Sequence, residues 1–264
     1  MRNKCRAGRI CCGETDRRVR SFDSGFAFAQ DDNFRFGKDA ERKQRNMKQD
    51  TLLMFDLDGT LWDSAQAVAE SWNEVFLKAD PSLPELTAED VHGVMGMTMK
   101  EIGQVLQPAI APEKREQVFE ECCRHEVDYL YDHPGTLYPR LRETLEELRG
   151  MGYELAIVSN CQLGYVKAFL HGSGVGDLFI DYEEWERTGL VKGENIRLVM
   201  ERNGYRKGLY VGDTRKDEEA ARVAGIPFIH ASYGFGKTEK PDAVICAFSE
   251  LPALLRQAED KKHD

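Results

Sequence analysis

The sequence predicts a protein of the α/β class, with a doubly wound parallel sheet and a helical segment inserted after the first strand. Short apolar runs alternate with helical patterns from residue 140 onwards, as in successive βαβ units. The run Leu52–Phe55 is continuously apolar, which is typical of a strand buried on both faces of a parallel sheet. Residues 64–133 instead show helical patterns and no strong strand pattern.

Composition limits the possible partners of the chain. Its 264 residues include 41% hydrophobic and 31% charged residues, which is ordinary for a globular protein. A net charge of −10 argues against a nucleic acid or an anionic membrane as the main partner. No apolar run approaches the length of a membrane span. The seven cysteines form no metal-binding spacing, so we expect reduced thiols and a cytoplasmic protein.

The first 46 residues differ from the rest of the chain. They contain 12 Lys or Arg, seven Asp or Glu, and no Leu, and they show no sustained helical or strand period. They also lack the apolar stretch of a signal peptide. We therefore predict that residues 1–46 are a disordered extension and that the native protein starts at Met47. Residues 47–63 and 134–264 would then form the α/β core, with 64–133 as the insert.

The insert is predicted to consist of helices. Apolar residues recur at helical spacing over Ala65–Ala79, and prolines follow directly. Thr87–Asp90 has the form of a capping box and opens a second helix. A third helical stretch begins at Pro112 and extends to about Tyr131. Residues 133–139 contain two prolines and a glycine, so we expect a stiff linker back to the core.

The remaining chain is predicted to complete the sheet and its covering helices. The expected helices are Leu141–Arg149, Leu163–Leu170, Glu194–Asn203, Lys216–Ala224 and Leu251–Gln257, and the expected strands are Tyr153–Val158, Leu178–Asp181, Leu209–Val211, Phe228–His230 and Asp242–Cys246.

Two aspartates follow the first strand directly. Asp56 and Asp58 flank one residue, so they project from the same side of an extended chain, and Gly59 then ends the strand. The carboxyl ends of parallel strands form the edge at which α/β proteins bind ligands. Two like charges are costly there unless a positive group lies between them, and a hard divalent cation would suit oxygen ligands.

Residues 56–61, Asp-Leu-Asp-Gly-Thr-Leu, resemble the first motif of the haloacid dehalogenase-like (HAD) hydrolases, most of which are Mg-dependent phosphatases. The resemblance implies that Asp56 is a nucleophile that forms an aspartyl-phosphate, and that Asp58 is the general acid and base. It also implies that the helical insert is the cap domain of the family's first cap class, over a Rossmann-like core.

Three later stretches resemble the other motifs of the family, in the same order. Ser159 and Asn160 follow a predicted strand, and the resemblance implies that they bind phosphoryl oxygens together with Lys192, which we place in a loop before a helix. Asp213 follows another strand, and Asp217 lies near a helix N-terminus, where the helix dipole alone favours a carboxylate. The family pattern implies a Mg²⁺ ion bound by the Asp56 and Asp213 carboxylates and the Asp58 backbone carbonyl. Asp217 would hold Lys192 or a metal-bound water.

We therefore expect a cytoplasmic, Mg-dependent phosphatase that hydrolyses a small phosphorylated metabolite and is similar to phosphoglycolate phosphatase-like members of the family. A phosphomutase such as β-phosphoglucomutase is the alternative, but Thr60 favours hydrolysis. A non-catalytic module that binds a phosphorylated ligand is a further alternative. Asp58 argues against the dehalogenases themselves, whose first motif lacks it. The identity of the substrate does not follow from the sequence, and the chain is expected to be a monomer or a homodimer.

Residues outside the motifs receive minor roles. The segment Gly93–Thr98 is a possible substrate-facing loop, by analogy with other caps. Trp62 and Tyr138 border the linkers and are expected to serve packing. Glu183–Glu186 is most simply a solvated face.

Overall fold

The computed structural model describes residues 49–97, 101–102, 105–106, 110 and 112–263, which belong to one compact unit. The predicted extension, residues 1–46, and the predicted start at Met47 lie outside the described residues. Within the described residues, no helix is both long and apolar enough to cross a membrane.

The central element is a six-stranded parallel sheet, which confirms the predicted fold class. The strand order β5-β4-β1-β6-β7-β8 places the first strand in the middle. Its neighbours on either side come from much later in the chain, as parallel crossovers require. The strands are β1 (Thr51–Phe55), β4 (Glu154–Ser159), β5 (Phe179–Glu184), β6 (Lys207–Gly212), β7 (Phe228–Ala231) and β8 (Ala243–Ile245).

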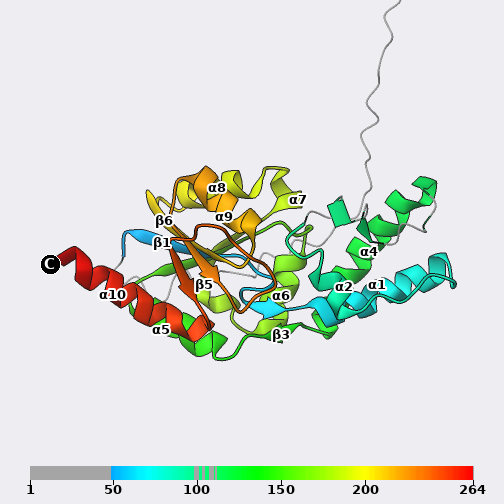
Figure 1. Cartoon of the computed structure of the whole chain (residues 1–264), viewed down its shortest axis with the longest axis horizontal. Helices are drawn as coiled ribbons and strands as arrows, with labels where there is room; N and C mark the ends of the chain where they lie inside the picture. Colours follow the sequence, from blue (N-terminus) through cyan, green and yellow to red (C-terminus); the bar gives the residue numbers. More distant parts are fainter. Residues whose placement is uncertain (1–48, 98–100, 103–104, 107–109, 111, 264) are drawn as a thin grey trace, which may run out of the picture. The chain divides into compact units, whose positions relative to one another are not determined.

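Strand β1 shows how the sheet is buried on both faces. Leu53 and Phe55 belong to one apolar cluster, whereas the alternate residues Leu52 and Met54 belong to another. All four side chains are fully buried, as a continuous apolar run predicts. Figure 1 shows helices α8 and α9 on one side of the sheet and α5 and α10 on the other. These and the remaining core helices are α5 (Leu141–Gly150), α6 (Tyr165–Ser173), α7 (Trp185–Thr188), α8 (Lys192–Arg202), α9 (Arg215–Ala224) and α10 (Leu251–His263), with 3₁₀ turns at Gly176–Leu178 and Phe248–Glu250.

The described residues between 64 and 133 include three labelled helices: α1 (Ala65–Ala79), α2 (Ala88–His92) and α4 (Pro112–Asp132). The bounds of α1 are those the sequence predicts. Helices α1 and α4 pack through aromatic side chains, with the Phe119 ring edge-on to Trp72 and Phe76. These helices lie together at one end of the sheet (Figure 1). The boundaries of a separate cap domain stay a prediction.

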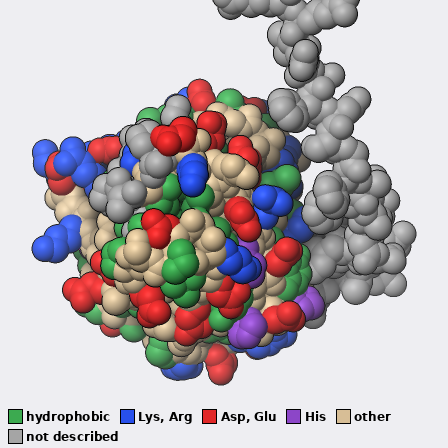
Figure 2. Space-filling view, turned by 90° about the vertical axis from the view of Figure 1, so that its right-hand side faces the viewer, with side chains coloured by type: hydrophobic (Ala, Val, Ile, Leu, Met, Phe, Trp, Pro, Cys, Tyr) green, Lys and Arg blue, Asp and Glu red, His purple; other side chains and the backbone are tan. Residues whose placement is uncertain are grey.

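Figure 2 views the molecule from the end that carries α1 and α4. Acidic and basic side chains are interspersed over the described part of this face. Such an interspersed surface gives no broad field of one sign, in keeping with the modest net charge of −10.

The stiff linker predicted at residues 133–139 contains a strand that the sequence analysis missed. Strand β3 (Thr136–Leu137) pairs antiparallel with β2 (Trp62–Asp63), so both connections to the helical insert pass through one short ribbon. Gly135 allows this approach, because a Cβ atom there would lie 2.8 Å from the Asp63 carbonyl oxygen. Two-residue strands carry too little sequence pattern to be recognised.

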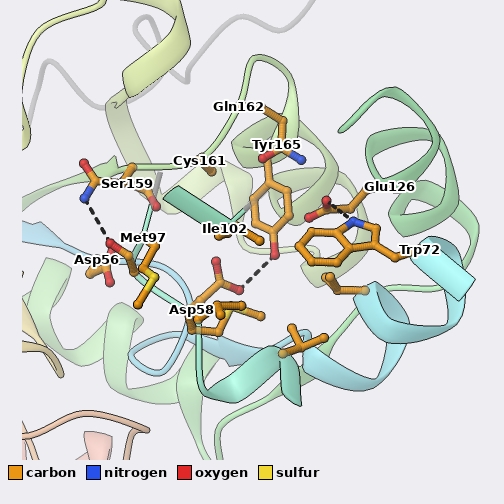
Figure 3. A pocket seen from close by; sticks show the side chains of 16 residues that line it. Asp56, Asp58, Trp72, Met97, Ile102, Glu126, Ser159, Cys161, Gln162 and Tyr165 are labelled. Carbon is orange, nitrogen blue, oxygen red and sulfur yellow. Dashed lines mark hydrogen bonds between the residues drawn. The ribbon is translucent and has the colours of Figure 1, made fainter. Parts of the chain in front are cut away.

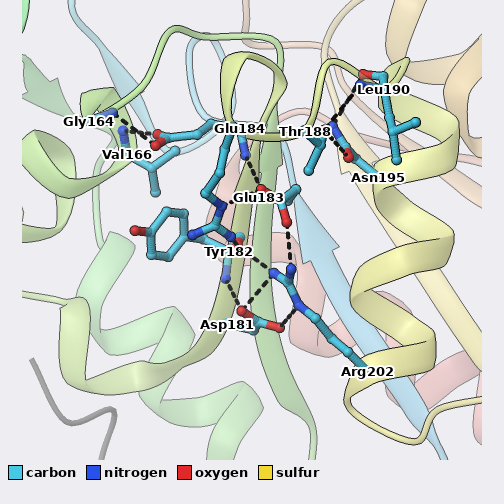
Figure 4. Close-up of polar contacts among 11 residues, drawn as sticks. Gly164, Val166, Asp181, Tyr182, Glu183, Glu184, Thr188, Leu190, Asn195 and Arg202 are labelled. Carbon is cyan, nitrogen blue, oxygen red and sulfur yellow. Dashed lines mark hydrogen bonds and ion pairs between the residues drawn. The ribbon is translucent and has the colours of Figure 1, made fainter. Parts of the chain in front are cut away.

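The interpretation of Glu183–Glu186 as a solvated face is wrong for its first two residues. Glu183 and Glu184 are 1% and 0% exposed, because β5 extends three residues beyond its predicted end. The Glu184 carboxylate accepts hydrogen bonds from the backbone N–H groups of Gly164 and Val166, at the start of α6. Glu183 forms an ion pair with Arg187. It forms a second ion pair with Arg202 (Figure 4). The two carboxylates are therefore buried with partners, which is how buried charges are stabilised.

Candidate active site

Asp56 lies at the carboxyl end of β1 and is 3% exposed. Its Oδ1 accepts a hydrogen bond from Lys192 Nζ at 2.8 Å, and the same ammonium donates to Asp217 Oδ1 at 2.6 Å. Lys192 itself is buried, and it is the first residue of α8 rather than a loop residue as predicted. The structure thus brings one cation between two carboxylates from distant parts of the chain.

Asp58 has different partners, none of them charged. Its Oδ1 accepts hydrogen bonds from Trp62 Nε1 at 2.8 Å, Ser64 Oγ at 2.6 Å and Tyr165 Oη at 2.9 Å. Burial raises the pKa of this carboxyl above its usual range, against the lowering effect of these donors. Because three donors converge on Oδ1, we assign a proton on this group to Oδ2.

Asp213 directly follows β6, and backbone N–H groups surround its side chain. Its Oδ2 accepts hydrogen bonds from the N–H groups of Phe235 at 2.8 Å and Gly236 at 3.1 Å. Its Oδ1 is buried and has no hydrogen-bond partner among the described residues. One oxygen each from Asp56, Asp213 and Asp217 lie within 4.8 Å of one another. A buried, unpartnered carboxylate oxygen beside two other carboxylates fits a hard divalent cation.

Asp217 has two functions at once. Its Oδ2 accepts hydrogen bonds from Thr214 N and Thr214 Oγ1, forming a capping box at the start of α9. Its Oδ1 holds Lys192. The sequence allowed two roles for Asp217, as a carboxylate at a helix N-terminus and as a partner for Lys192. The structure shows that one side chain has both roles.

The pKa values of the site reflect crowded negative charge. Burial and the neighbouring Asp217 carboxylate raise the pKa of Asp56 to about 7 and that of Asp213 to about 8. Burial alone would lower the pKa of Lys192, but the nearby Asp217 and Asp56 carboxylates hold it well above its usual range. A single lysine therefore leaves the cluster short of positive charge, and a divalent cation would supply it.

Two glycines permit this packing around Asp213. A Cβ atom on Gly59 would lie 2.3 Å from Asp213 Oδ2, and one on Gly234 would lie 2.4 Å from Asp213 Cβ. Gly59 also has a φ of +78°, a conformation that disfavours other residues. The Gly59 of the first motif is therefore required by a carboxylate more than 150 residues later in the chain.

Ser159 is the last residue of β4 and Asn160 follows it, and both line the same cavity as Asp56 and Asp58. Ser159 is buried. The Asn160 side chain donates a hydrogen bond to the backbone carbonyl of Gly96, in the helical insert, at 3.3 Å. The structure thus gathers all the predicted site residues at one edge of the sheet, while their catalytic roles remain proposals.

The cavity extends from these residues into the helical insert, and four of its polar lining residues belong to no sequence motif. They are Trp72, Glu126, Gln162 and Tyr165. Glu126 lies in a charge-rich helical stretch, where the sequence offers no sign that this glutamate is buried. Tyr165 and Gln162 follow the second motif, but only their contacts identify them. The apolar lining includes Val68, Val91, Val94, Met95, Met97 and Ile102.

This fold and site belong to a known class of enzyme. The family model described as haloacid dehalogenase-like hydrolase matches residues 53–231, and the chain therefore belongs to that family. The predicted resemblance and the predicted enzyme class, a phosphatase, are confirmed.

Comparison with individual proteins shows which members of the family this chain is similar to. The chain is 30% identical over 219 residues to phosphoglycolate phosphatase of Vibrio vulnificus strain CMCP6, covering 76% of this chain and 93% of that protein. It is 28% identical to phosphoglycolate phosphatase of Pasteurella multocida strain Pm70, covering 79% of this chain and 100% of that protein. The crystal structure of a predicted phosphoglycolate phosphatase from Haemophilus somnus 129PT aligns with a TM-score of 0.68 at 27% identity, covering 78% of this chain and 99% of that one.

Proposed function

We propose that this phosphatase hydrolyses a small phosphorylated metabolite with Mg²⁺, through an aspartyl-phosphate on Asp56. The observation that carries the proposal is the placement of Asp56: it is paired with a buried lysine and shares one cavity with a protonatable Asp58. A nucleophile next to a cation and an acid next to a leaving group are what phosphate monoester cleavage requires.

The first step would form a bond from Asp56 to phosphorus. Since Oδ1 of Asp56 is held by Lys192, Oδ2 is the oxygen expected to attack. The bond to the leaving oxygen breaks, and Asp58 Oδ2 gives its proton to that oxygen. Ser159, Asn160 and Lys192 would contact the phosphoryl oxygens, and Lys192 also favours the ionised form of Asp56.

The second step would release phosphate. Asp58, now ionised, takes a proton from a water molecule, whose oxygen attacks phosphorus and frees the Asp56 carboxylate. The same residue serves as acid and then as base, which restores its starting protonation state.

Magnesium would be held by the carboxylates of Asp56 and Asp213 and by the backbone carbonyl of Asp58. When bound, it supplies positive charge that stabilises the phosphoryl oxygens. Asp217 would act on this centre indirectly, by positioning Lys192.

Phosphate release from a panel of phosphorylated metabolites tests the proposal, and phosphoglycolate is the first compound because the relatives carry that name. We expect release that requires MgCl₂, stops with EDTA and is lost in Asp56→Asn. The control is Asp50→Asn, because Asp50 is an exposed aspartate whose side-chain partners within the described part of the chain are the surface residues Lys207 and Thr51. Release that survives Asp56→Asn would refute the mechanism. Transfer of phosphate within a sugar phosphate, without release, would indicate a mutase.

A further inference from the structure

The far end of the cavity contains a buried carboxyl group for which the proposed reaction has no use. Glu126 of α4 is 3% exposed, and its Oε2 accepts a hydrogen bond from Trp72 Nε1 of α1 at 2.6 Å. Figure 3 shows Glu126 and Gln162 at one end of the lining residues and Asp56 and Ser159 at the other. A leaving group that extends away from Asp58 would therefore approach Glu126.

Gln162 provides a second polar group at this end. It is 4% exposed, and its Nε2 makes no hydrogen bond of ordinary geometry among the described residues, although the side chain lies close enough to the Glu126 carboxyl to lower the pKa of that group. A buried amide donor without a well-formed hydrogen bond costs free energy, which a ligand that accepts this hydrogen bond would recover. Apolar residues, including Val68, Val91 and Ile102, make up much of the remaining lining of the cavity, together with Trp72 and Tyr165.

The space available is small. The cavity has a volume of about 40 Å³. One water molecule needs roughly 10–15 Å³ in this measure, so the cavity has room for a group of only a few non-hydrogen atoms.

We propose that Glu126 and Gln162 bind a hydroxyl group on the leaving group, so that the substrate is a short phosphate monoester with a free hydroxyl. This inference rests on the proposed phosphatase function. A hydroxyl can donate to the Glu126 carboxyl and accept from Gln162 Nε2 at the same time.

The competing groups fit less well. A carboxylate would carry its charge into a buried site, and no lysine or arginine is among the described residues that line the cavity. An ammonium group would also bring a buried charge, and it cannot accept the hydrogen bond that Gln162 Nε2 donates. A methyl group would leave both polar side chains without a ligand partner.

Four esters that differ only in their terminal group provide the test. They are 2-hydroxyethyl phosphate, phosphoglycolate, phosphoethanolamine and ethyl phosphate. We expect kcat/KM for the hydroxyethyl ester to exceed each of the others by at least about tenfold, because a site built for hydrogen bonding rejects analogues that lack the group. Calorimetric binding to the Asp56→Asn protein should show the same order without turnover.

Variants of Glu126 and Gln162 test whether these residues recognise the hydroxyl group or only stabilise the fold. In Glu126→Leu and in Gln162→Leu the preference for hydroxyethyl over ethyl phosphate should fall to about twofold or less, with ethyl phosphate cleaved nearly as well as before. Glu121→Leu is the control, since Glu121 is an exposed glutamate of the same helix. If Glu126→Leu does not fold, Gln162→Leu alone decides.

The proposal is overturned if phosphoglycolate, phosphoethanolamine or ethyl phosphate is preferred, if both variants keep the hydroxyl preference, or if none of the esters binds. The phosphatase function has its own readout. Hydrolysis of any ester that disappears in Asp56→Asn supports that function, even where the hydroxyl preference is absent.

Discussion

Two aspartates only two positions apart acquire different chemistry from their surroundings. Burial raises the pKa of both carboxyls. Asp56, however, contacts the Lys192 ammonium, which favours its ionised form. Asp58 accepts hydrogen bonds from neutral donors instead. A pair of carboxyls whose environments differ in this way divides naturally into a nucleophile and an acid.

This division predicts the kinetics of Asp58→Asn. The asparagine keeps an acceptor for the three donors but carries no acidic proton, so kcat for an alkyl phosphate should fall by about 10²–10⁴-fold. With p-nitrophenyl phosphate, whose leaving group needs no proton, only the second step should be slow. Stopped-flow absorbance should then show a burst of about one nitrophenolate per enzyme. A uniform loss with no burst would contradict the two assigned roles of Asp58.

Glu126 predicts a pH dependence of stability. Burial raises its pKa to about 8 in the folded protein, from 4.5 as the ordinary value. Between these values the folded state holds a proton that the unfolded state has lost, so the stability contributed by this group falls as pH rises. Glu126→Gln removes the effect. Relative to wild type, the variant should gain up to about 1.4 kcal/mol per pH unit across that window.

Urea unfolding of wild type and Glu126→Gln at pH 5.5 and 7.5 measures this difference, with Glu121→Gln as the control variant. A stability difference that does not change with pH would show that Glu126 titrates normally.

At the scale of elements, the sequence predicts the presence and type of helices and strands better than the residues at which they begin and end. The long helix Ala65–Ala79 and the buried strand β1 have strong patterns and are found where expected. The start of α8 was missed, because Val191 has no capping side chain to mark it, and Lys192 was therefore placed in a loop. Strand β5 runs on through Glu183 and Glu184 because arginines and backbone N–H groups from other elements satisfy both carboxylates. Such partners are distant in sequence and leave no local signal.

The loop after β1 predicts a sharp glycine effect. In Gly59→Ala, the new Cβ would overlap Asp213 Oδ2, so the loop must shift away from the site. We expect phosphatase activity to fall by at least about 100-fold, since an error of about 1 Å in positioning can cost that much. The matched control is Gly204→Ala, which has a similar φ of +76° but no atom within 4 Å of the new Cβ. The control should lose stability through strain but keep its kcat, and equal activity losses in both would contradict the steric argument.

At the scale of the whole molecule, the sequence identifies the catalytic edge of the sheet but not the part of the cavity that lies in the helical insert. Each motif residue follows an apolar strand, so the topology alone brings Asp56, Ser159 and Asp213 together. Glu126 and Trp72 meet only because α1 packs on α4, and their burial depends on contacts between side chains far apart in sequence. Helical periodicity cannot show which polar residue is enclosed.

The acidic cluster also links metal binding to global stability. Three buried carboxylates share one lysine, so wild-type protein in EDTA should be less stable near neutral pH than Asp213→Asn. Added MgCl₂ should raise the Tm of wild type and have little effect on the variant. A free ligand at about 100 times its Kd contributes roughly 2.7 kcal/mol. Calorimetric melting of both proteins with and without MgCl₂ measures this, and equal responses would exclude Asp213 as a ligand.

The order of strands in the sheet has a consequence for synthesis of the chain. Strand β1 emerges from the ribosome before both of its neighbours, and Lys207, the partner of Thr51, follows 156 residues later. At about 5–20 residues per second, the central strand waits on the order of 8–30 s for its second neighbour. During that time an apolar strand has an open edge, the state in which nascent chains aggregate or engage chaperones. The central position of β1, which places Asp56 at the catalytic edge of the sheet, therefore also leaves this strand unpaired during part of synthesis.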